Sequence, residues 1–146
     1  MNKQSEDSLH AIPLRQALLV FMPFACGYFL SYLFRSVNAV IAPNLIAEFD
    51  LSASELGLLT SVYFLTFASL QIPIGVFLDR FGPRRVNAAL LILAAIGAFI
   101  FSQADSFQSL LLGRAFIGFG VAACLMSSIK IFSLWFPKEK LPEMTG

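Results

Sequence analysis

Between two long apolar segments, the chain reads Gly75-Val76-Phe77-Leu78-Asp79-Arg80-Phe81-Gly82-Pro83-Arg84-Arg85. Gly82 permits a tight turn, and Pro83 suits the first turn of a following helix. Asp79 carries a negative charge that is favoured beside an arginine or a helix N-terminus. A small residue at Gly75 would let two helices approach closely. The stretch therefore predicts a short charged connection between two packed helices.

The segments around this connection are long enough to cross a bilayer, for which a helix needs about 20 apolar residues. The runs 56–78 and 86–104 hold no charge, and two further apolar stretches lie on either side of them. Ser52 with Glu55 forms a capping box, and Asp105 and Ser106 are both N-cap candidates for the last helix. Pro73 is expected to bend the second span. We expect four transmembrane helices, at about 16–42, 55–78, 86–104 and 109–135, after a cytoplasmic tail at 1–13.

Composition supports this fold class, an all-α membrane protein. The chain is 58% hydrophobic and 13% charged, with a mean hydropathy of +0.77, whereas soluble domains carry about 25% charged residues. A net charge of +1 gives no electrostatic case for nucleic acid. Cys26 and Cys124 lie apart in apolar runs, and His10 is the only histidine, so no metal site and no cofactor are expected.

Basic residues predict the orientation, because cytoplasmic loops are rich in Lys and Arg. With the N-terminus inside, the outer segments hold only acids, namely Glu48, Asp50, Glu55 and Asp105. The inner segments then hold Lys3, Arg15, Arg80, Arg84, Arg85, Lys138 and Lys140. We therefore expect a multi-pass protein of the cytoplasmic (inner) membrane.

The connection at 75–85 resembles the signature loop of the Major Facilitator Superfamily, G-x-x-x-D-R-x-G-R-R, with Pro83 in place of a basic residue. In the last span, Arg114-Ala-Phe-Ile-Gly118-Phe-Gly120 resembles the family pattern R-x-x-x-G-x-G. Glycines in that span also suit plain helix packing. The resemblance implies a loop that latches the two halves of a transporter, through Gly75, Asp79, Arg80, Gly82, Arg84 and Arg85.

Members of this family have twelve spans in two six-helix halves. The resemblance therefore implies that residues 14–146 form part of the N-terminal half, a fragment that is not competent alone. Its partners would be the lipid bilayer and the remaining helices of the same transporter.

Charged side chains inside a membrane are costly and usually functional. Three occur within the expected spans, all basic: Arg35, Arg114 and Lys130. Arg114, a motif residue, is expected to bond to neighbouring helices. Lys130 is either an anchor at the inner interface or a residue of the transport cavity.

Arg35 lies in a polar stripe expected on one helix face, which also holds Tyr28, Ser31, Tyr32, Asn38 and Ala39. This stripe could line a water-filled path, although Arg35 could instead reach outward to the interface. Tyr63 and Gln71 of the second span are further candidate contacts, or else form interhelical hydrogen bonds. The predicted substrate-binding residues are Tyr28, Tyr32, Arg35, Asn38, Tyr63, Gln71 and Lys130.

A cationic cavity without carboxylates suits an anion, which arginine binds through a two-pronged fork. The segment Tyr32-Leu33-Phe34-Arg35 resembles the first span of the organophosphate and organic-anion branches, although Ser36 stands where the organophosphate members often have lysine. The nitrate branch carries its arginine in span two, which has none here. These features predict a secondary active transporter for a small organic anion, a carboxylate or an organophosphate, with H⁺ as a candidate coupling ion.

Two alternatives stay open: a drug:proton antiporter of the same superfamily, and a non-transporting four-helix membrane scaffold. An exporter of the small multidrug type would need a glutamate in the first span, which is absent. An enzyme is not expected, because no nucleophile with an adjacent base or CxxC pair occurs in the apolar runs.

Overall fold

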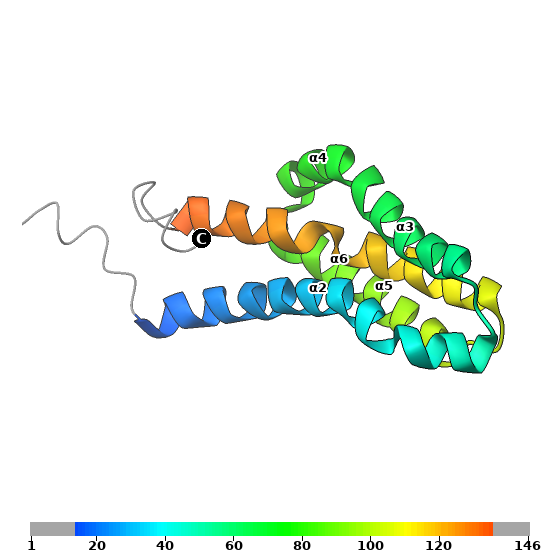
Figure 1. The fold of residues 1–146 in the computed structure, drawn as a ribbon. Helices are drawn as coiled ribbons and strands as arrows, with labels where there is room; N and C mark the ends of the chain where they lie inside the picture. Colours follow the sequence, from blue (N-terminus) through cyan, green and yellow to red (C-terminus); the bar gives the residue numbers. More distant parts are fainter. Residues whose placement is uncertain (1–13, 136–146) are drawn as a thin grey trace, which may run out of the picture.

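The computed structural model describes residues 14–135, and the surroundings of side chains for residues 22–131. In this range the chain forms helices and no strands: α2 (Leu14–Phe49), α3 (Ala53–Ser69), α4 (Gln71–Phe81), α5 (Pro83–Ser102) and α6 (Phe107–Trp135) (Figure 1). The all-α class is therefore confirmed. The expected tail at 1–13 lies outside the described residues.

Three of these helices are long and apolar enough to cross a bilayer by themselves, over Met22–Phe49, Pro83–Ser102 and Phe107–Ile131. The pair α3 and α4 passes the same test together, as one span bent by 45°. The structure thus agrees with four spans. The first helix runs on to Phe49, beyond the expected span end at 42, because α2 accommodates Pro43 within the helix.

The bend between α3 and α4 has a local cause. Pro73 has no backbone N–H, so the carbonyl of Ser69, four residues earlier, loses its helical partner. Helix α3 ends at Ser69, and the regular bond pattern resumes where the N–H of Ile74 donates to the carbonyl of Leu70 at 2.9 Å. The bend predicted from Pro73 is therefore present, one turn before the proline.

The helix ends follow the predicted caps. The Ser52 hydroxyl accepts the N–H of Glu55 at 3.3 Å, and the Glu55 carboxylate accepts the N–H of Ser52 at 2.8 Å. The hydroxyl of Ser106 accepts the N–H three residues later at 3.4 Å. Gly82 has a φ of +80°, a value that favours glycine, and Pro83 opens α5. Short connections therefore return the chain across the bundle each time.

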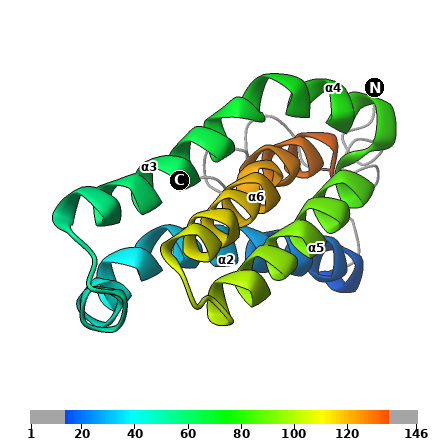
Figure 2. The same ribbon diagram turned by 90° about the vertical axis from the view of Figure 1, so that its right-hand side faces the viewer.

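Helix α6 lies at the centre of the bundle, with α2, α3 and α5 around it (Figure 2). Its glycines allow this. A Cβ added at Gly118 would lie 2.5 Å from the carbonyl oxygen of Tyr63 on α3, and one at Gly120 would lie 2.5 Å from the Cα of Ala94 on α5. The two motif glycines therefore bring the backbones of α3 and α5 against α6, as small residues do in membrane proteins.

The buried seam of α2 repeats every seven residues. Phe24, Ser31, Asn38 and Leu45 are each exposed by 7% or less. Seven residues make almost two full helical turns, so these side chains form one line along the helix. The hydroxyl of Ser128 on α6 donates to the carbonyl of Phe24 at 3.3 Å, which fixes α6 on this line.

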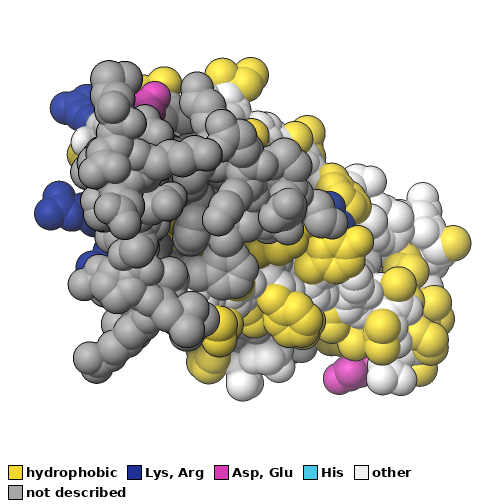
Figure 3. All heavy atoms as spheres, turned by 90° about the vertical axis from the view of Figure 1, so that its left-hand side faces the viewer, with side chains coloured by type: hydrophobic (Ala, Val, Ile, Leu, Met, Phe, Trp, Pro, Cys, Tyr) yellow, Lys and Arg dark blue, Asp and Glu magenta, His cyan; other side chains and the backbone are white. Residues whose placement is uncertain are grey.

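The topology separates the charges. Arg80, Arg84 and Arg85 surround the α4–α5 connection, and we call this the basic end of the bundle. Figure 3 views the molecule along the bundle, with Lys and Arg side chains at its rim and hydrophobic ones on its flank. Leucines of α2, α3, α6 and the connection between α2 and α3 cluster at the opposite end: Leu45, Leu51, Leu59 and Leu110. The connections at that end carry the acids Glu48, Asp50, Glu55 and Asp105.

Candidate functional site

Arg114 is buried in the centre of the bundle, with 2% of its surface exposed. Its Nη1 donates to the carbonyl oxygen of Phe34 at 3.2 Å, and its Nη2 donates to the side-chain oxygen of Asn38. Its guanidinium also stands 4.8 Å from the ring centre of Phe101 on α5. Arg114 thus joins α6 to α2 and α5, which confirms that it bonds to neighbouring helices.

Asn38 extends this contact to a third helix. Its amide nitrogen donates to the hydroxyl of Thr60 on α3 at 2.7 Å, and that hydroxyl donates to the carbonyl of Leu56 at 3.2 Å. The chain from Arg114 through Asn38 to Thr60 links α6, α2 and α3. Because the Asn38 amide already bonds on both sides, its role as a substrate contact stays a prediction.

Arg35 has a different environment, although it is only three residues from Asn38. Its side chain is exposed, and its guanidinium lies 5.4 Å from the ring centre of Phe67 and 5.8 Å from that of Phe64, both on α3. Arg35 is also within electrostatic reach of Tyr63, whose buried hydroxyl has no hydrogen-bond partner among the described residues. The α2–α3 face thus presents a cation and an unused hydroxyl.

The polar stripe expected on one face of α2 is divided between two faces. Tyr28, Tyr32 and Arg35 are exposed, and the two tyrosine rings lie 6.5 Å apart between their centres. Ser31 and Asn38 are buried in the bundle instead. The expectation of a single stripe is wrong, because a shift of three residues turns a helix by about 300°, which leaves the two sets on neighbouring faces.

The remaining candidate contacts lie elsewhere. Gln71 is half-buried at the first residue of α4, directly after the bend. Lys130 forms an ion pair with Asp79, which connects α6 to the signature connection. Arg35 and Tyr63 are thus the predicted contacts that the structure brings together, whereas Lys130 belongs to the basic end of the bundle.

The signature connection shows its turn but not the close approach expected at its start. A Cβ added at Gly75 would meet nothing within 4 Å, so among the described residues no helix packs tightly on it, and the close approach stays a prediction. Arg80 stands 5.4 Å from the ring centre of Phe81. Arg84 and Arg85 are exposed, without a hydrogen bond or ion pair to any described residue.

Sequence reasoning places Phe67 on roughly the same face of the second span as Thr60, Tyr63 and Gln71, but it missed Phe64 and the contact of both rings with Arg35. Phe64 and Phe67 are three residues apart, so they share a helix face. That spacing was visible, but the chain has 16 phenylalanines. Only the packing of α3 on α2 distinguishes this pair from the phenylalanines that face outward.

Comparisons with known proteins agree with these motifs. The family model of the Major Facilitator Superfamily matches residues 24–146. The chain is 32% identical over 82% of its length to the nitrate/nitrite transporter NrtP of Picosynechococcus, of which it covers 22%. It is 30% identical over 75% of its length to the probable sulfoacetate transporter SauU of Cupriavidus necator, covering 26% of that protein. It is 31% identical over 73% of its length to the probable L-galactonate transporter of Escherichia coli, covering 24%. The chain thus spans about a quarter of the length of these curated relatives.

Proposed function

Because the chain belongs to the Major Facilitator Superfamily, we propose that it forms part of the N-terminal half of a secondary active transporter for a small organic anion. Its apolar helices are those of an integral membrane protein. In this proposal Arg35 contacts the anion, and Arg114 holds the helices that position Arg35.

The exposed guanidinium of Arg35 carries the proposal. Arg114 is buried and is held by a backbone carbonyl and an amide oxygen, so its guanidinium is fixed between the helices and is not accessible to a ligand. Among the described residues, Arg35 contacts the faces of two aromatic rings and lies within electrostatic reach of the Tyr63 hydroxyl, so most of its five N–H donors remain for a ligand. No carboxylate lies beside it, since the acids of residues 22–131 occupy helix ends or connections. An anion would therefore gain a cationic partner without displacing one.

The names of the relatives support an anionic substrate, because nitrate, sulfoacetate and galactonate are all anions. Two features favour an organic anion. The membrane-embedded part of the second span, α3 and the start of α4, contains no arginine, which departs from the pattern that the resemblance implies for the nitrate branch. The rings of Phe64 and Phe67 beside Arg35 also offer apolar surface to the carbon skeleton of a ligand.

The proposal includes an orientation, with the N-terminus and the basic end in the cytoplasm of an inner membrane. The charge separation between the two ends of the bundle supports it. The other helices of the transporter would complete the cavity, and H⁺ is the candidate coupling ion.

The test is uptake by the protein that contains this chain, at its expressed length, in proteoliposomes. The probes are radiolabelled sulfoacetate and galactonate, with nitrate as the inorganic comparison. Arg35→Ala should reduce uptake at low substrate concentration by about 10- to 100-fold, because a hydrogen bond to a charged group contributes about 1.5–3 kcal/mol. Arg35→Lys should retain an intermediate rate, since the charge remains and the fork is lost.

The control is Ser36→Ala, which alters an exposed neighbour on the same helix and should leave uptake unchanged. Equal amounts of each variant in the membrane exclude an insertion defect. Normal kinetics in Arg35→Ala would refute the anion contact. Uptake of cationic drugs in place of anions would support the antiporter, and no uptake of any probe would support the scaffold.

A further inference from the structure

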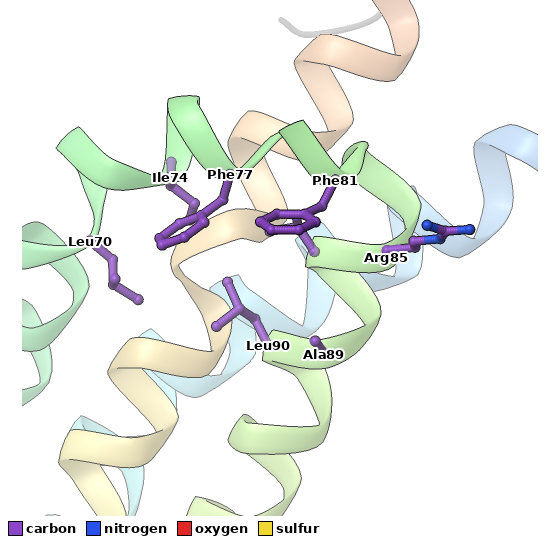
Figure 4. Close-up of a pocket in the computed structure, with 8 residues that line it drawn as sticks. Leu70, Ile74, Phe77, Phe81, Arg85, Ala89 and Leu90 are labelled. Atoms are coloured by element: carbon purple, nitrogen blue, oxygen red, sulfur yellow. The ribbon is translucent and has the colours of Figure 1, made fainter. Parts of the chain in front are cut away.

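A groove of about 360 Å³ lies between α4 and α5, away from the Arg35 face. Figure 4 shows Ile74, Phe77 and Phe81 of α4 above it, with Ala89 and Leu90 of α5 opposite. Its lining is almost entirely carbon. Its volume is in the range of pockets that hold small ligands. An occupant must therefore be an apolar chain that needs no hydrogen bond along its length.

One end of this groove is charged. Arg85 is the only charged residue of the lining, and Figure 4 shows its guanidinium extending away from the apolar side chains. Arg84 lies beside it in sequence, and neither has an ion pair with a described residue. The acid of the same connection, Asp79, is paired with Lys130. The groove thus ends at two arginines whose charges are not neutralised within the described chain.

The flanks of the groove face outward and are apolar. Ile72 and Val76 of α4 are exposed by 89% and 66%, and Ile92 of α5 is exposed by 63%. No described helix covers these surfaces, and in an integral membrane protein a surface that no other helix covers meets hydrocarbon, which brings lipid to the mouth of the groove.

We propose that the groove binds an anionic phospholipid, with an acyl chain between α4 and α5 and the phosphate at Arg85. The two parts of the site match the two parts of this ligand. The acyl chain fills apolar space without polar groups to satisfy, and the phosphate accepts the guanidinium fork. A polypeptide helix is a poorer match, because it is about 10–12 Å wide with its side chains. The inference does not depend on the transported substrate.

The experiment uses the protein at its expressed length in nanodiscs of phosphatidylglycerol and phosphatidylcholine. A photoreactive benzoylphenylalanine replaces Phe77, and mass spectrometry identifies what it captures. We expect capture of phospholipid, with phosphatidylglycerol enriched over its share of the bilayer. Capture of another segment of the same protein, or equal capture of both lipids, would overturn the proposal.

Matched pairs of variants distinguish lipid binding in the groove from general attraction of anionic lipid to the charged surface. Arg85→Gln should reduce the preference for phosphatidylglycerol about fivefold, from about 1 kcal/mol per basic residue near the surface. Arg84→Gln should reduce it less, since Arg84 does not line the groove. Ala89→Trp should fill the groove and abolish capture of both lipids, whereas Ala95→Trp, at an exposed position of α5 outside it, should not. Equal effects within either pair would contradict a defined site.

Discussion

Asn38→Leu tests whether the contacts of Arg114 hold the bundle together. Leucine has the same branching and the same number of side-chain heavy atoms as asparagine but no polar atom, and its methyl groups are bulkier, so the change removes hydrogen bonds without leaving a void. Arg114 Nη2 loses its acceptor, and the Thr60 hydroxyl loses a donor. The bond from Arg114 to the carbonyl of Phe34 remains.

The expected change in the free energy of unfolding follows from the loss of these two hydrogen bonds. A hydrogen bond to a charged group contributes about 1.5–3 kcal/mol. An interhelical bond between neutral side chains in a membrane averages about 0.6 kcal/mol. Asn38→Leu should therefore destabilise the fold by about 2–3.5 kcal/mol, whereas Thr60→Val, which removes the neutral interhelical bond and the bond from the hydroxyl to the Leu56 carbonyl of its own helix, should cost about 1 kcal/mol.

Equilibrium unfolding in mixed micelles with increasing SDS measures these values. Asn38→Asp is the informative control. Its carboxylate can accept from Arg114, and the Thr60 hydroxyl can turn from the Leu56 carbonyl to donate to it. This variant should be at least as stable as the wild type, because it adds a counter-charge to a buried guanidinium. The reasoning is refuted if Asn38→Leu costs no more than Thr60→Val, or if Asn38→Asp is as unstable as Asn38→Leu.

Three further changes test other parts of the structure. Gly118→Ala should destabilise the fold by about 1–3 kcal/mol in the same assay, because its Cβ would strike the backbone of α3; Gly57→Ala, with nothing within 4 Å, is the matched control, and equal effects would contradict the packing. Gly82→Ala should cost about 1–3 kcal/mol, since a φ of +80° strains any residue with a Cβ; an unchanged unfolding curve would contradict the turn. Asp79→Lys or Lys130→Asp alone should each cost at most about 1 kcal/mol, and the double exchange should restore that loss, because the pair is partly exposed; a double variant with the summed loss of the two single ones would show that the pair contributes nothing.

The fold could be predicted from the sequence because its signals are local. The capping box at Ser52 and the turn at Gly82 depend on neighbouring residues, and both are present in the structure. Pro73 predicted the bend for the same reason, since a missing N–H acts on the carbonyl four residues earlier. The extension of α2 through Pro43 was not predicted, because a proline ends a helix in some contexts and is tolerated in others.

The site could be predicted only in part because it depends on which helices meet. A sequence gives the positions of Arg35, Arg114 and Lys130 but not their partners. Lys130 finds an acid on α4, 51 residues earlier in the chain, and Arg114 finds a carbonyl on α2, 80 residues earlier. At Gly75 the close approach predicted from the small residue stays a prediction, because no described helix lies against it.

The two arginines of the first and last helices show how a bundle assigns different tasks to similar residues. A guanidinium in the bilayer costs about 2.5–3.5 kcal/mol on insertion scales, so each must have compensating contacts. Arg114 obtains these contacts from the carbonyl of Phe34, the side chain of Asn38 and the ring of Phe101, so it stabilises the packing of the helices. The guanidinium of Arg35 lies over the rings of Phe64 and Phe67. The face of an aromatic ring attracts a cation, but it does not accept the hydrogen bonds that the guanidinium donates in its own plane.

This difference follows from the seven-residue spacing of the buried positions on α2. Asn38 continues the buried line of Phe24, Ser31 and Leu45, so it faces α6 and takes the charge of Arg114. Arg35, three residues earlier, turns toward α3, where it meets the rings of Phe64 and Phe67 and the hydroxyl of Tyr63 but no carboxylate or carbonyl among the described residues. An anion that binds Arg35 would supply the negatively charged hydrogen-bond acceptor that no described residue provides. Arg35 is therefore the position where a ligand gains most, and where its loss should disturb the fold least.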